Sequence, residues 1–391
     1  MIPVLVQTAL RRLAVLAAVG ATAFVAAAAT ASPAPSVDGR AVLVGNGATG
    51  ELLHRVRQAQ KVPMASITKI MTALVVLENA RPDEIVTVGG PAPTIGGSTV
   101  GLRAGERLSV RDLLTALLVQ SANDAAYALA YHVGDGSVER FIRMMNRKAQ
   151  ELDLRDTHFA RPDGLDAAGH YSSARDLFKL ARVAMHKPLF RRLVRIQTTT
   201  IPGGRSLRNW NDLLFIYPGM IGVKTGHTSS AGWSEVAAAR RKGVTIYAII
   251  LGSPSREQRN ADLARLLDWG FDQYRSVTAI RGGAVYAEAL VPFADRRLKL
   301  VAAEPAYALV RVDRDLVERV VAPAMVELPV REGQKLGEVQ VLDRGKIIAT
   351  EPLLAAASIE EAGLGRRLGW YAGRALDHAG NLFSGFVGLF T

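Results

Sequence analysis

The order of the sequence patterns predicts a mixed α/β domain followed by a small all-β module. Strand-like runs near 41–57 and again over 220–251 enclose a helical middle. Strands at both ends of a helical stretch favour an antiparallel sheet that the two ends of the domain build together. From residue 276 onward, short strand-like runs alternate with Gly, Asp and Pro, which is typical of a small all-β module. A chain of 391 residues is long enough for both.

Periodicity and turn signals place the elements of the larger domain. Asn46-Gly47 and the stretch 240–243 indicate turns between strands, and Ser109 with Asp112 forms a capping-box pattern before a leucine-rich helix face. The expected elements are, in chain order, strands at 41–45 and 51–57, helices at 66–79, from 109, at 123–133, 137–152 and 173–185, strands at 220–225, 233–239 and 244–251, and a helix at 260–274. The expected strands of the module are 284–291, 297–301, 307–312, 324–328, 338–342 and 346–350.

The first 31 residues have the pattern of a secretory signal peptide. Arg11-Arg12 precede an apolar run over 13–29, and Ala29-Thr30-Ala31 supplies a small-x-small cleavage pattern. An uncleaved anchor helix is the alternative, although the run is about as short as a spanning helix can be. We therefore expect an exported protein with four parts: a leader (1–31), the α/β domain (32–275), the β module (276–357) and a tail (358–391).

Charge and composition exclude several classes of protein. The formal net charge is +12, and loss of Arg11 and Arg12 with the leader leaves 12 − 2 = +10. Such a surplus favours an anionic surface, and high arginine usage by the genome is the alternative cause. The basic residues are not interleaved with aromatic ones, so nucleic acid is not an expected partner. Without any cysteine, the chain has no disulfide, zinc-thiolate site or thiol nucleophile.

No metal or other cofactor is expected. Five histidines lack the paired spacing of metal ligands, and we interpret them as structural or exposed: His54, His132, His158, His170 and His186. Asp163 and Asp166 could imitate a pair of catalytic carboxylates, but Pro162-Asp163-Gly164 is first of all a turn sequence.

Ser66 and Lys69 stand three residues apart at the start of an apolar helical stretch. Residues i and i+3 share a helix face, so the hydroxyl and the amine can meet. A serine hydroxyl needs an adjacent base to act as a nucleophile. Lysine can be that base if burial and a second cation lower its pKa. A helix start with a solvated lysine would give the same pattern.

Two further polar motifs follow in the chain. Ser121-Ala122-Asn123 lies between two expected helices, where it could relay a proton and clamp a peptide amide, or simply cap a helix. Lys224-Thr225-Gly226 ends an expected strand, where Lys and Thr could bind a carboxylate and Gly could admit a substrate backbone. An ordinary exit from a strand would explain the second motif equally well. Each motif alone is modest evidence for a catalytic site, and the order of the three motifs along the chain strengthens that interpretation.

The three motifs and their surroundings resemble the low-molecular-mass penicillin-binding proteins of the serine-type D-alanyl-D-alanine carboxypeptidase family. The segments that carry the similarity are Pro63–Ala73, Gly164–Asp166, His170–Asp176, Gly222–Thr228, Leu251-Gly252, Arg259 and Leu266–Phe271. The similarity is strong over 40–275 and weaker beyond. It implies a penicillin-binding, β-lactamase-like transpeptidase domain with an antiparallel sheet flanked by helices, then a small β domain and a C-terminal amphipathic helix.

The resemblance also implies roles in the chemistry. Ser66 would be the nucleophile and Lys69 its general base. Ser121 would relay a proton to the leaving D-alanine. The backbone N–H groups of Ser66 and His227 would form the oxyanion hole that acyl transfer requires. The family trims the terminal D-alanine from cell-wall peptides, is inhibited by penicillin and uses no cofactor.

Substrate binding would fall to a second set of residues. By the same resemblance, Asn123 would hold the substrate amide. Lys224, Thr225 and Arg259 would bind the terminal carboxylate, and Gly226 would let the substrate backbone approach. The expected partners are thus a peptidoglycan peptide, β-lactam inhibitors and an anionic membrane surface, outside the cytoplasm.

Three alternatives to a carboxypeptidase deserve comparison. A β-lactamase needs a carboxylate to activate the deacylating water, and Glu151 is the one candidate soon after Ser121, on a helix-like stretch without the expected loop. A DD-endopeptidase, which cuts cross-links, is a closer relative. A non-catalytic wall-binding protein has no need of Ser66, Lys69 and Lys224 together.

The tail over 363–391 is expected to lie in the membrane surface. Its apolar residues recur at helical spacing: Leu364, Leu368, Tyr371, Ala375, Leu382, Phe383, Phe386 and Phe390. Arg366, Arg367 and Arg374 could meet anionic headgroups. The purely apolar end from Leu382 is too short to span a bilayer. A helix packed on the β module is the alternative, but seven glycines would each weaken a helix in water by about 1 kcal/mol.

Overall fold

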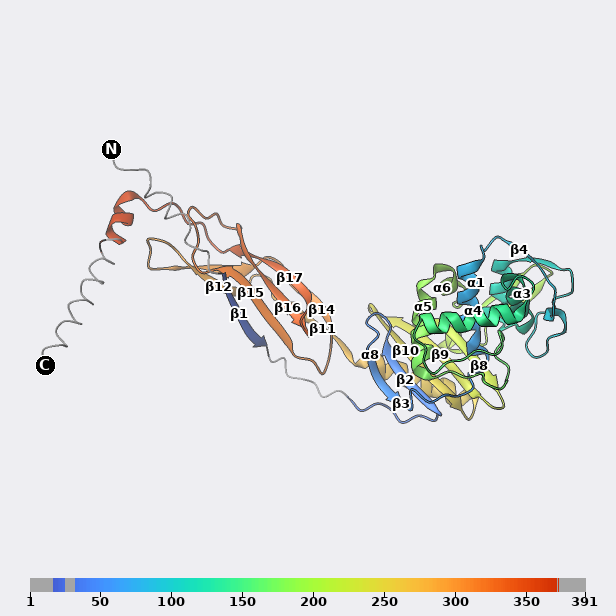
Figure 1. Cartoon of the computed structure of the whole chain (residues 1–391). Helices are drawn as coiled ribbons and strands as arrows, with labels where there is room; N and C mark the ends of the chain where they lie inside the picture. The colour runs from blue at the N-terminus through green and yellow to red at the C-terminus, as the bar shows by residue number, and fades with distance from the viewer. Residues whose placement is uncertain (1–16, 25–31, 371, 373–391) are drawn as a thin grey trace. The chain divides into compact units, whose positions relative to one another are not determined.

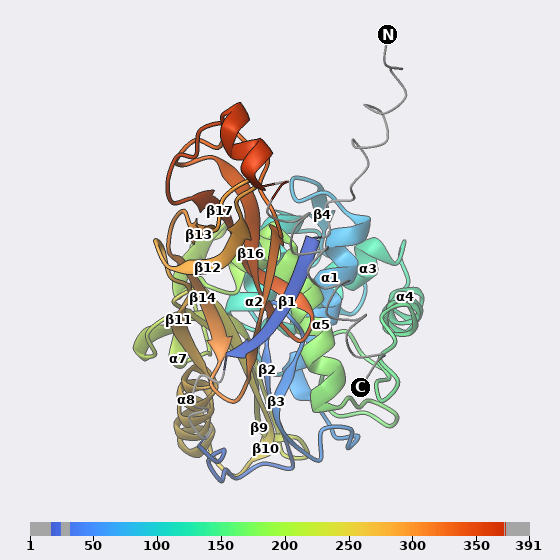
Figure 2. The same cartoon turned by 90° about the vertical axis from the view of Figure 1, so that its left-hand side faces the viewer.

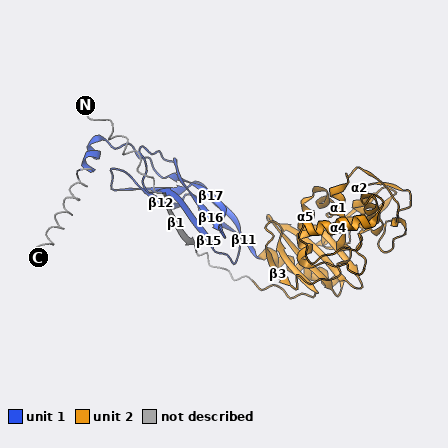
Figure 3. Ribbon diagram, viewed as in Figure 1, with its two compact units in different colours: residues 1–31, 273–391 blue, residues 32–272 orange. Residues whose placement is uncertain are grey.

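The computed structural model describes residues 17–24, 32–370 and 372 (Figure 1). The chain divides into two compact units (Figure 3). The first, called here the α/β unit, comprises Ser32–Asp272. The second, called the β unit, comprises Gln273–Thr391 together with Met1–Ala31.

A five-stranded antiparallel sheet forms the centre of the α/β unit, in the order β3-β2-β10-β9-β8. The strands are β2 (Ala41–Asn46), β3 (Leu52–Val56), β8 (Met220–Thr228), β9 (Gly232–Arg241) and β10 (Val244–Ser253). The first and last parts of the unit therefore build one sheet, as the sequence predicted. All six residues of β2 are buried, which is the pattern of a strand covered on both faces.

Helices α8 (Arg256–Asp272) and α5 (Ala174–His186) cover opposite faces of this sheet (Figure 2). Gly270 of α8 packs so closely on Ile246 that an added Cβ would lie 2.7 Å from its Cγ2. Phe178 of α5 lies against Gly45, where a Cβ would be 2.6 Å from the ring. The Cβ of Gly270 would also be close to Val44. Because Val44 and Gly45 are neighbours in β2 and point to opposite faces of the sheet, α8 and α5 cover opposite faces.

The helical middle packs around α1 (Lys69–Asn79), whose first eight residues are all buried. A single 3₁₀ turn, η3 (Ala65–Thr68), precedes α1. Ser109 accepts a hydrogen bond from the Asp112 backbone N–H, which confirms the predicted cap. The other elements of the unit are β4 (Ile85–Thr87), η4 (Ala92–Thr94), β5 (Arg107–Ser109), α2 (Val110–Val119), α3 (Asn123–Val133), α4 (Val138–Glu151), α6 (Pro188–Leu193), β6 (Thr198–Ile201), β7 (Arg205–Arg208) and α7 (Leu213–Ile216).

The β unit combines a six-stranded sheet, in the order β1-β15-β16-β17-β13-β12, with the two-stranded sheet β11-β14. Its strands are β1 (Ala17–Phe24), β11 (Tyr274–Ile280), β12 (Val285–Leu290), β13 (Arg297–Ala302), β14 (Ala306–Arg311), β15 (Leu316–Pro323), β16 (Lys335–Asp343) and β17 (Lys346–Ala355). The expected leader lies outside the described residues except for β1, which pairs with β15.

Two elements of the sequence prediction were wrong in position. The helix expected over 260–274 is α8, which begins at Arg256 and ends at Asp272, because β11 starts two residues later with a β-branched, alternating sequence. The strand expected at 324–328 is replaced by β15, which the prediction missed. Pro323 ends β15 because proline has no N–H for the next ladder hydrogen bond. The fold class itself, a mixed α/β domain followed by a β domain, is confirmed.

The described part of the tail is short. Residues 364–370 are helical, and Leu364 and Leu368 are exposed. The rest of the expected amphipathic helix, residues 371 and 373–391, lies outside the described residues. Within the described ranges, no helix is long and apolar enough to cross a bilayer.

Candidate active site

Ser66 and Lys69 meet because Ser66 lies within η3 and Lys69 directly follows it, as the first residue of α1. The sequence predicted an α-helix from residue 66, but Ala65–Thr68 form a 3₁₀ turn and the α-helix begins at Lys69. Side chains three residues apart are eclipsed in a 3₁₀ helix. The Lys69 Nζ atom lies 2.8 Å from the Ser66 Oγ atom. The turn thus places an amine against the hydroxyl, as the spacing predicted.

Lys69 is completely buried among polar partners. Its Nζ donates to the Asn123 Oδ1 atom at 2.7 Å and to the Asp163 backbone oxygen at 2.6 Å. Burial lowers the pKa of Lys69 to about 7, against the opposing influence of Asp163 and Asp124. A lysine with this pKa is partly neutral at physiological pH.

Ser121 and Asn123 stand at the start of α3 without capping it. The N-cap position is Ala122, and no side chain caps the helix, so the capping alternative is wrong. Ser121 has a φ of 61°, a left-handed conformation that is uncommon for serine. The Asn123 carboxamide accepts from Lys69 and donates through Nδ2 to the Gly96 backbone oxygen at 2.9 Å. It therefore holds the amine in place.

Strand β8 passes close to η3 at Gly226. A Cβ at this position would lie 2.8 Å from the Met64 oxygen and 3.1 Å from the Ser66 nitrogen. Glycine is required here by the protein's own backbone, a reason that the sequence did not reveal. Lys224 is buried, and its pKa is well lowered by burial and by the charge of Lys69. Thr225, one residue before Gly226, is buried at the side of the cleft.

Arg259 of α8 is almost completely buried, with 1% of its surface exposed. Its Nε lies 3.2 Å from Glu235 Oε2, and its Nη2 donates to Asn260 Oδ1 at 2.6 Å. Glu235 is opposite Thr225 in the β8–β9 register, and burial raises the pKa of its carboxyl group. The His227 ring stacks on Trp233, with 3.9 Å between centroids.

These groups surround a cleft of about 300 Å³. Its lining residues are Ser66, Ser98, Ser121, Trp210, Thr225, Gly226, His227, Trp233, Arg256 and Arg259. Six of the nine predicted site residues line the cleft, and the other three, Lys69, Asn123 and Lys224, are buried.

Sequence reasoning missed several residues of this cleft. Trp210 and Arg256 line it, and Arg256 forms a two-pronged ion pair with Asp212, with N–O distances of 2.5 and 2.7 Å. Neither residue belongs to a local motif, and only the fold brings them to Ser66. Asp163 contributes a backbone oxygen, which a sequence cannot display.

The residues that could indicate other chemistries lie elsewhere. Glu151, the candidate carboxylate of a β-lactamase, is on α4, where it pairs with Lys148 and lines a different cavity. Among the residues that the structure describes, no group of His, Asp and Glu side chains could hold a metal ion.

The chain resembles known proteins along most of its length. Residues 27–255 match the family described as D-alanyl-D-alanine carboxypeptidase, and residues 274–361 match the C-terminal domain of penicillin-binding protein 5. The D-alanyl-D-alanine carboxypeptidase DacD of Salmonella typhimurium is 33% identical over 354 residues, covering 86% of this chain and 90% of the relative. The chain belongs to the D-alanyl-D-alanine carboxypeptidase family.

Solved structures agree with this assignment. Penicillin-binding protein 5 from Haemophilus influenzae is 27% identical, with a TM-score of 0.62, and the match covers 84% of this chain and all of that one. The Streptomyces K15 DD-transpeptidase is 35% identical with a TM-score of 0.58, covering 61% of this chain and 99% of that one. The protein is thus a serine peptidase of a family that acts on the bacterial cell wall.

Proposed function

We propose that this carboxypeptidase removes the terminal D-alanine from peptidoglycan stem peptides through an acyl-enzyme on Ser66. The observation that carries the proposal is the environment of Lys69. Two of its three partners, the Asn123 Oδ1 atom and the Asp163 carbonyl oxygen, can only accept hydrogen bonds. A neutral amine has two N–H groups, so both are committed to these acceptors. Its lone pair is left facing the Ser66 hydroxyl.

The reaction follows from this arrangement. Ser66 Oγ attacks the carbonyl carbon of the penultimate D-alanine while Lys69 takes the hydroxyl proton. The peptide C–N bond breaks, and the leaving D-alanine takes a proton relayed from Lys69 through Ser121. Water then attacks the ester carbonyl and gives a proton to Lys69, and Lys69 returns a proton to Ser66 Oγ as the ester C–O bond breaks. The backbone N–H groups of Ser66 and His227 would stabilise the oxyanion in both steps.

Substrate binding is proposed for the far side of the cleft. The terminal carboxylate would lie against Thr225 and Arg259, with Lys224 buried beneath. An anion near Lys224 favours its charged form and would raise the lowered pKa of this lysine. To hold the peptide amide, Asn123 Nδ2 would exchange its hydrogen bond to the Gly96 oxygen for one to the substrate. Gly226 would let the substrate backbone approach. A β-lactam, which also carries a carboxylate beside a reactive amide, would acylate Ser66 in the same orientation.

The test is release of D-alanine from two peptides that differ only at the C-terminus. A peptide ending in free D-Ala-D-Ala should be hydrolysed, and its C-terminal amide should be at least tenfold poorer in kcat/KM because Arg259 and Lys224 lose their partner. The Ser66→Ala variant should release no D-alanine from either. Equal turnover of the two peptides would favour an endopeptidase.

The two ends of the chain are proposed to direct the protein to the outer face of the cytoplasmic membrane. Residues 1–31 would direct export, and residues 358–391 would bind the outer face of the membrane. In support, Leu364 and Leu368 are exposed one helical turn apart, so an apolar face is open to solvent. Trp370, however, packs edge-on against Phe293 at 5.4 Å, as a helix docked on the β unit would.

Sedimentation with anionic liposomes separates these two possibilities. The full-length mature protein should co-sediment with the vesicles, and a chain ending at Ala362 should stay in solution. If both forms behave alike, the tail is not the anchor.

A further inference from the structure

His170 is a buried histidine for which the reaction above has no use. It lies 5% exposed, on the loop between α4 and α5, directly beside Thr68 of η3. Its Nδ1 atom accepts a hydrogen bond from the Ala160 backbone N–H at 3.0 Å. Burial lowers the pKa of His170 to about 4, so the ring is neutral at physiological pH. A neutral ring whose Nδ1 accepts must carry its proton on Nε2.

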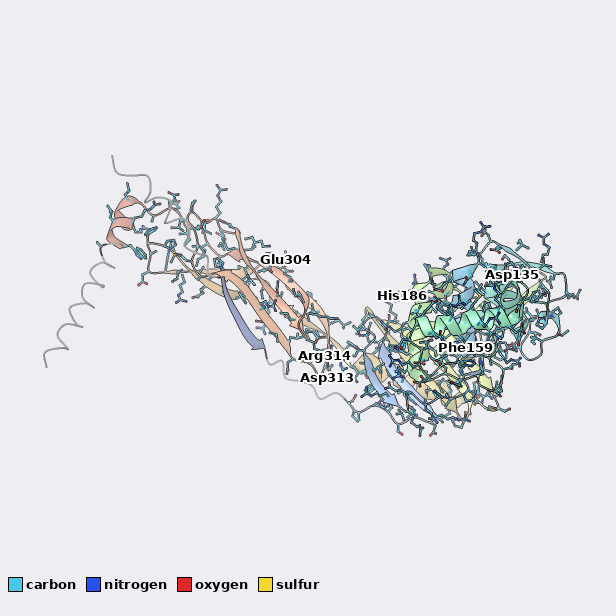
Figure 4. All side chains as sticks on the ribbon, in the orientation of Figure 1. Asp135, Phe159, His186, Glu304, Asp313 and Arg314 are labelled. Carbon is cyan, nitrogen blue, oxygen red and sulfur yellow. The ribbon has the colours of Figure 1, made fainter. Side chains whose placement is uncertain are left out.

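That proton starts a chain of hydrogen bonds with one consistent direction. His170 Nε2 donates to the Thr68 Oγ1 atom at 2.8 Å. The Thr68 hydroxyl is then free to donate, and it does so to the Ala65 backbone oxygen at 2.8 Å. The Phe159 ring, which lies beside α4 in Figure 4, meets the His170 ring edge-on at 6.1 Å and restricts its rotation. This series of hydrogen bonds therefore ends on the carbonyl group that directly precedes Ser66.

The Ala65 carbonyl and the Ser66 N–H belong to the same peptide unit. Because the unit is planar and trans, the direction of the C=O group sets the opposite direction of the N–H group. Ala65 has a φ of 48°, a left-handed conformation that alanine does not favour and that the surroundings must maintain. Gly164 leaves room for this carbonyl, since a Cβ there would lie 2.0 Å from the Ala65 oxygen.

We propose that His170 is a positioning residue, which acts through Thr68 to turn the Ala65–Ser66 peptide so that the Ser66 N–H faces the substrate carbonyl. This inference rests on the proposed function, in which that N–H is one of two oxyanion donors. The contribution is to the transition state, because the negative charge on the oxygen develops there. Loss of a whole oxyanion donor costs about 10²–10³ in kcat. Misorientation of a donor that remains should cost less, about tenfold to a hundredfold.

Two substitutions of His170 separate orientation from packing. His170→Asn places its amide where Nδ1 lies, so it can still accept from Ala160 but cannot reach Thr68. His170→Gln reaches the position of Nε2 and can donate to the Thr68 hydroxyl. His158, on the same loop with its Nδ1 against the Gly169 oxygen, is exposed and provides the control His158→Asn.

The readout is kcat and KM for D-alanine release, with thermal unfolding of each variant as a check. His170→Asn should lower kcat at least tenfold and leave KM within about twofold. His170→Gln should restore kcat to within about threefold of the original protein, and His158→Asn should not change it. Equal losses in the Asn and Gln variants, or a change in KM alone, would overturn the proposal.

Thr68 provides a second measurement if the His170 variants unfold. Thr68→Ser keeps the hydroxyl and should retain kcat, whereas Thr68→Val removes it and should match His170→Asn. The double variant Thr68→Val/His170→Asn should be no slower than either single one, because both break the same chain. Additive losses would contradict the proposal. Failure of the original protein to become acylated at Ser66 would instead refute the proposed function.

Discussion

The α/β unit and the β unit bury different kinds of side chain. At its cleft the α/β unit buries three basic side chains, Lys69, Lys224 and Arg259, together with the carboxyl group of Glu235. In the described part of the β unit, Gln273 is the one buried polar residue. The β unit holds a cavity of about 380 Å³, larger than the cleft of about 300 Å³ at Ser66, but no serine, lysine or histidine lines it.

The difference shows where this protein accepts a cost in stability. Moving a charged group out of water costs several kcal/mol per ion even after relaxation. An apolar core has no charged or polar partner to offset that cost, and the described core of the β unit contains no buried charged group. The α/β unit bears it where the chemistry needs a lysine that can lose its proton and a cation that can hold a carboxylate. Buried charge, more than cavity size, therefore marks the active site.

A permanently charged side chain at position 69 should reduce acylation more than any other change to the buried charges. Lys69→Arg keeps the positive charge but cannot accept a proton. Acylation of Ser66 by a β-lactam should fall by about two decades or more, the usual scale for loss of a general base. Lys335→Arg, an exposed lysine of the β unit, is the matched control and should acylate normally. Near-normal acylation of Lys69→Arg would point to another base.

The pH dependence of acylation should reflect the lowered pKa of Lys69. Since the base is active only when neutral, the rate should rise with pH up to about 7 and level off above it. Below the pKa the rate should change about tenfold per pH unit. An unburied lysine would keep the rate rising to about pH 10. Stopped-flow acylation between pH 5 and 10 distinguishes the two profiles.

The stability of buried and exposed charge pairs should also differ. Glu235→Leu leaves Arg259 buried with fewer partners, and should lower the free energy of unfolding by about 2 kcal/mol. Glu361→Gln removes a partner of Arg367 that is largely exposed, and should cost less than about 0.5 kcal/mol. Urea denaturation of the full chain provides both values. Similar costs for the two variants would mean that burial does not set the energetics here.

The smallest effect on the cleft should come from the core of the β unit. Leu353 is fully buried in β17, and Leu353→Ala should destabilise the β unit by about 2–5 kcal/mol. Acylation of Ser66 should nevertheless stay within about twofold, because no charged group of the active site depends on that core. A large loss of acylation in a folded variant would show that the units are coupled.

The sequence predicted most of the fold because its local patterns agree with the final packing. Ser109 caps the helix that its pattern indicated, and the three strands β8, β9 and β10 follow the expected runs. The boundary between α8 and β11 was misplaced because no glycine or proline stands there, whereas β15 was missed although Pro323 marks its end. The end of α8 and the start of β11 are separated by Gln273 alone, and no local signal marks the change.

The site, too, contains residues that the sequence could predict and residues that it could not. Residues in motifs, such as Ser66 and Lys69, could be found because their spacing has a physical meaning. Glu235 and Trp210 could not, since only the sheet register places Glu235 opposite Thr225 and only loop packing brings Trp210 to the cleft. The role of Asp163 depends on a backbone oxygen, and that of His170 on a tautomer fixed by its neighbours.

Ser66 is the proposed nucleophile of acyl transfer, with a neutral Lys69 as its base. The most direct measurement is the mass of the protein, and of its proteolytic peptides, after incubation with penicillin. We expect one added β-lactam mass on the peptide that contains Ser66, and no added mass in the Ser66→Ala variant. A label on another residue, or a label that persists in the Ser66→Ala variant, would contradict it.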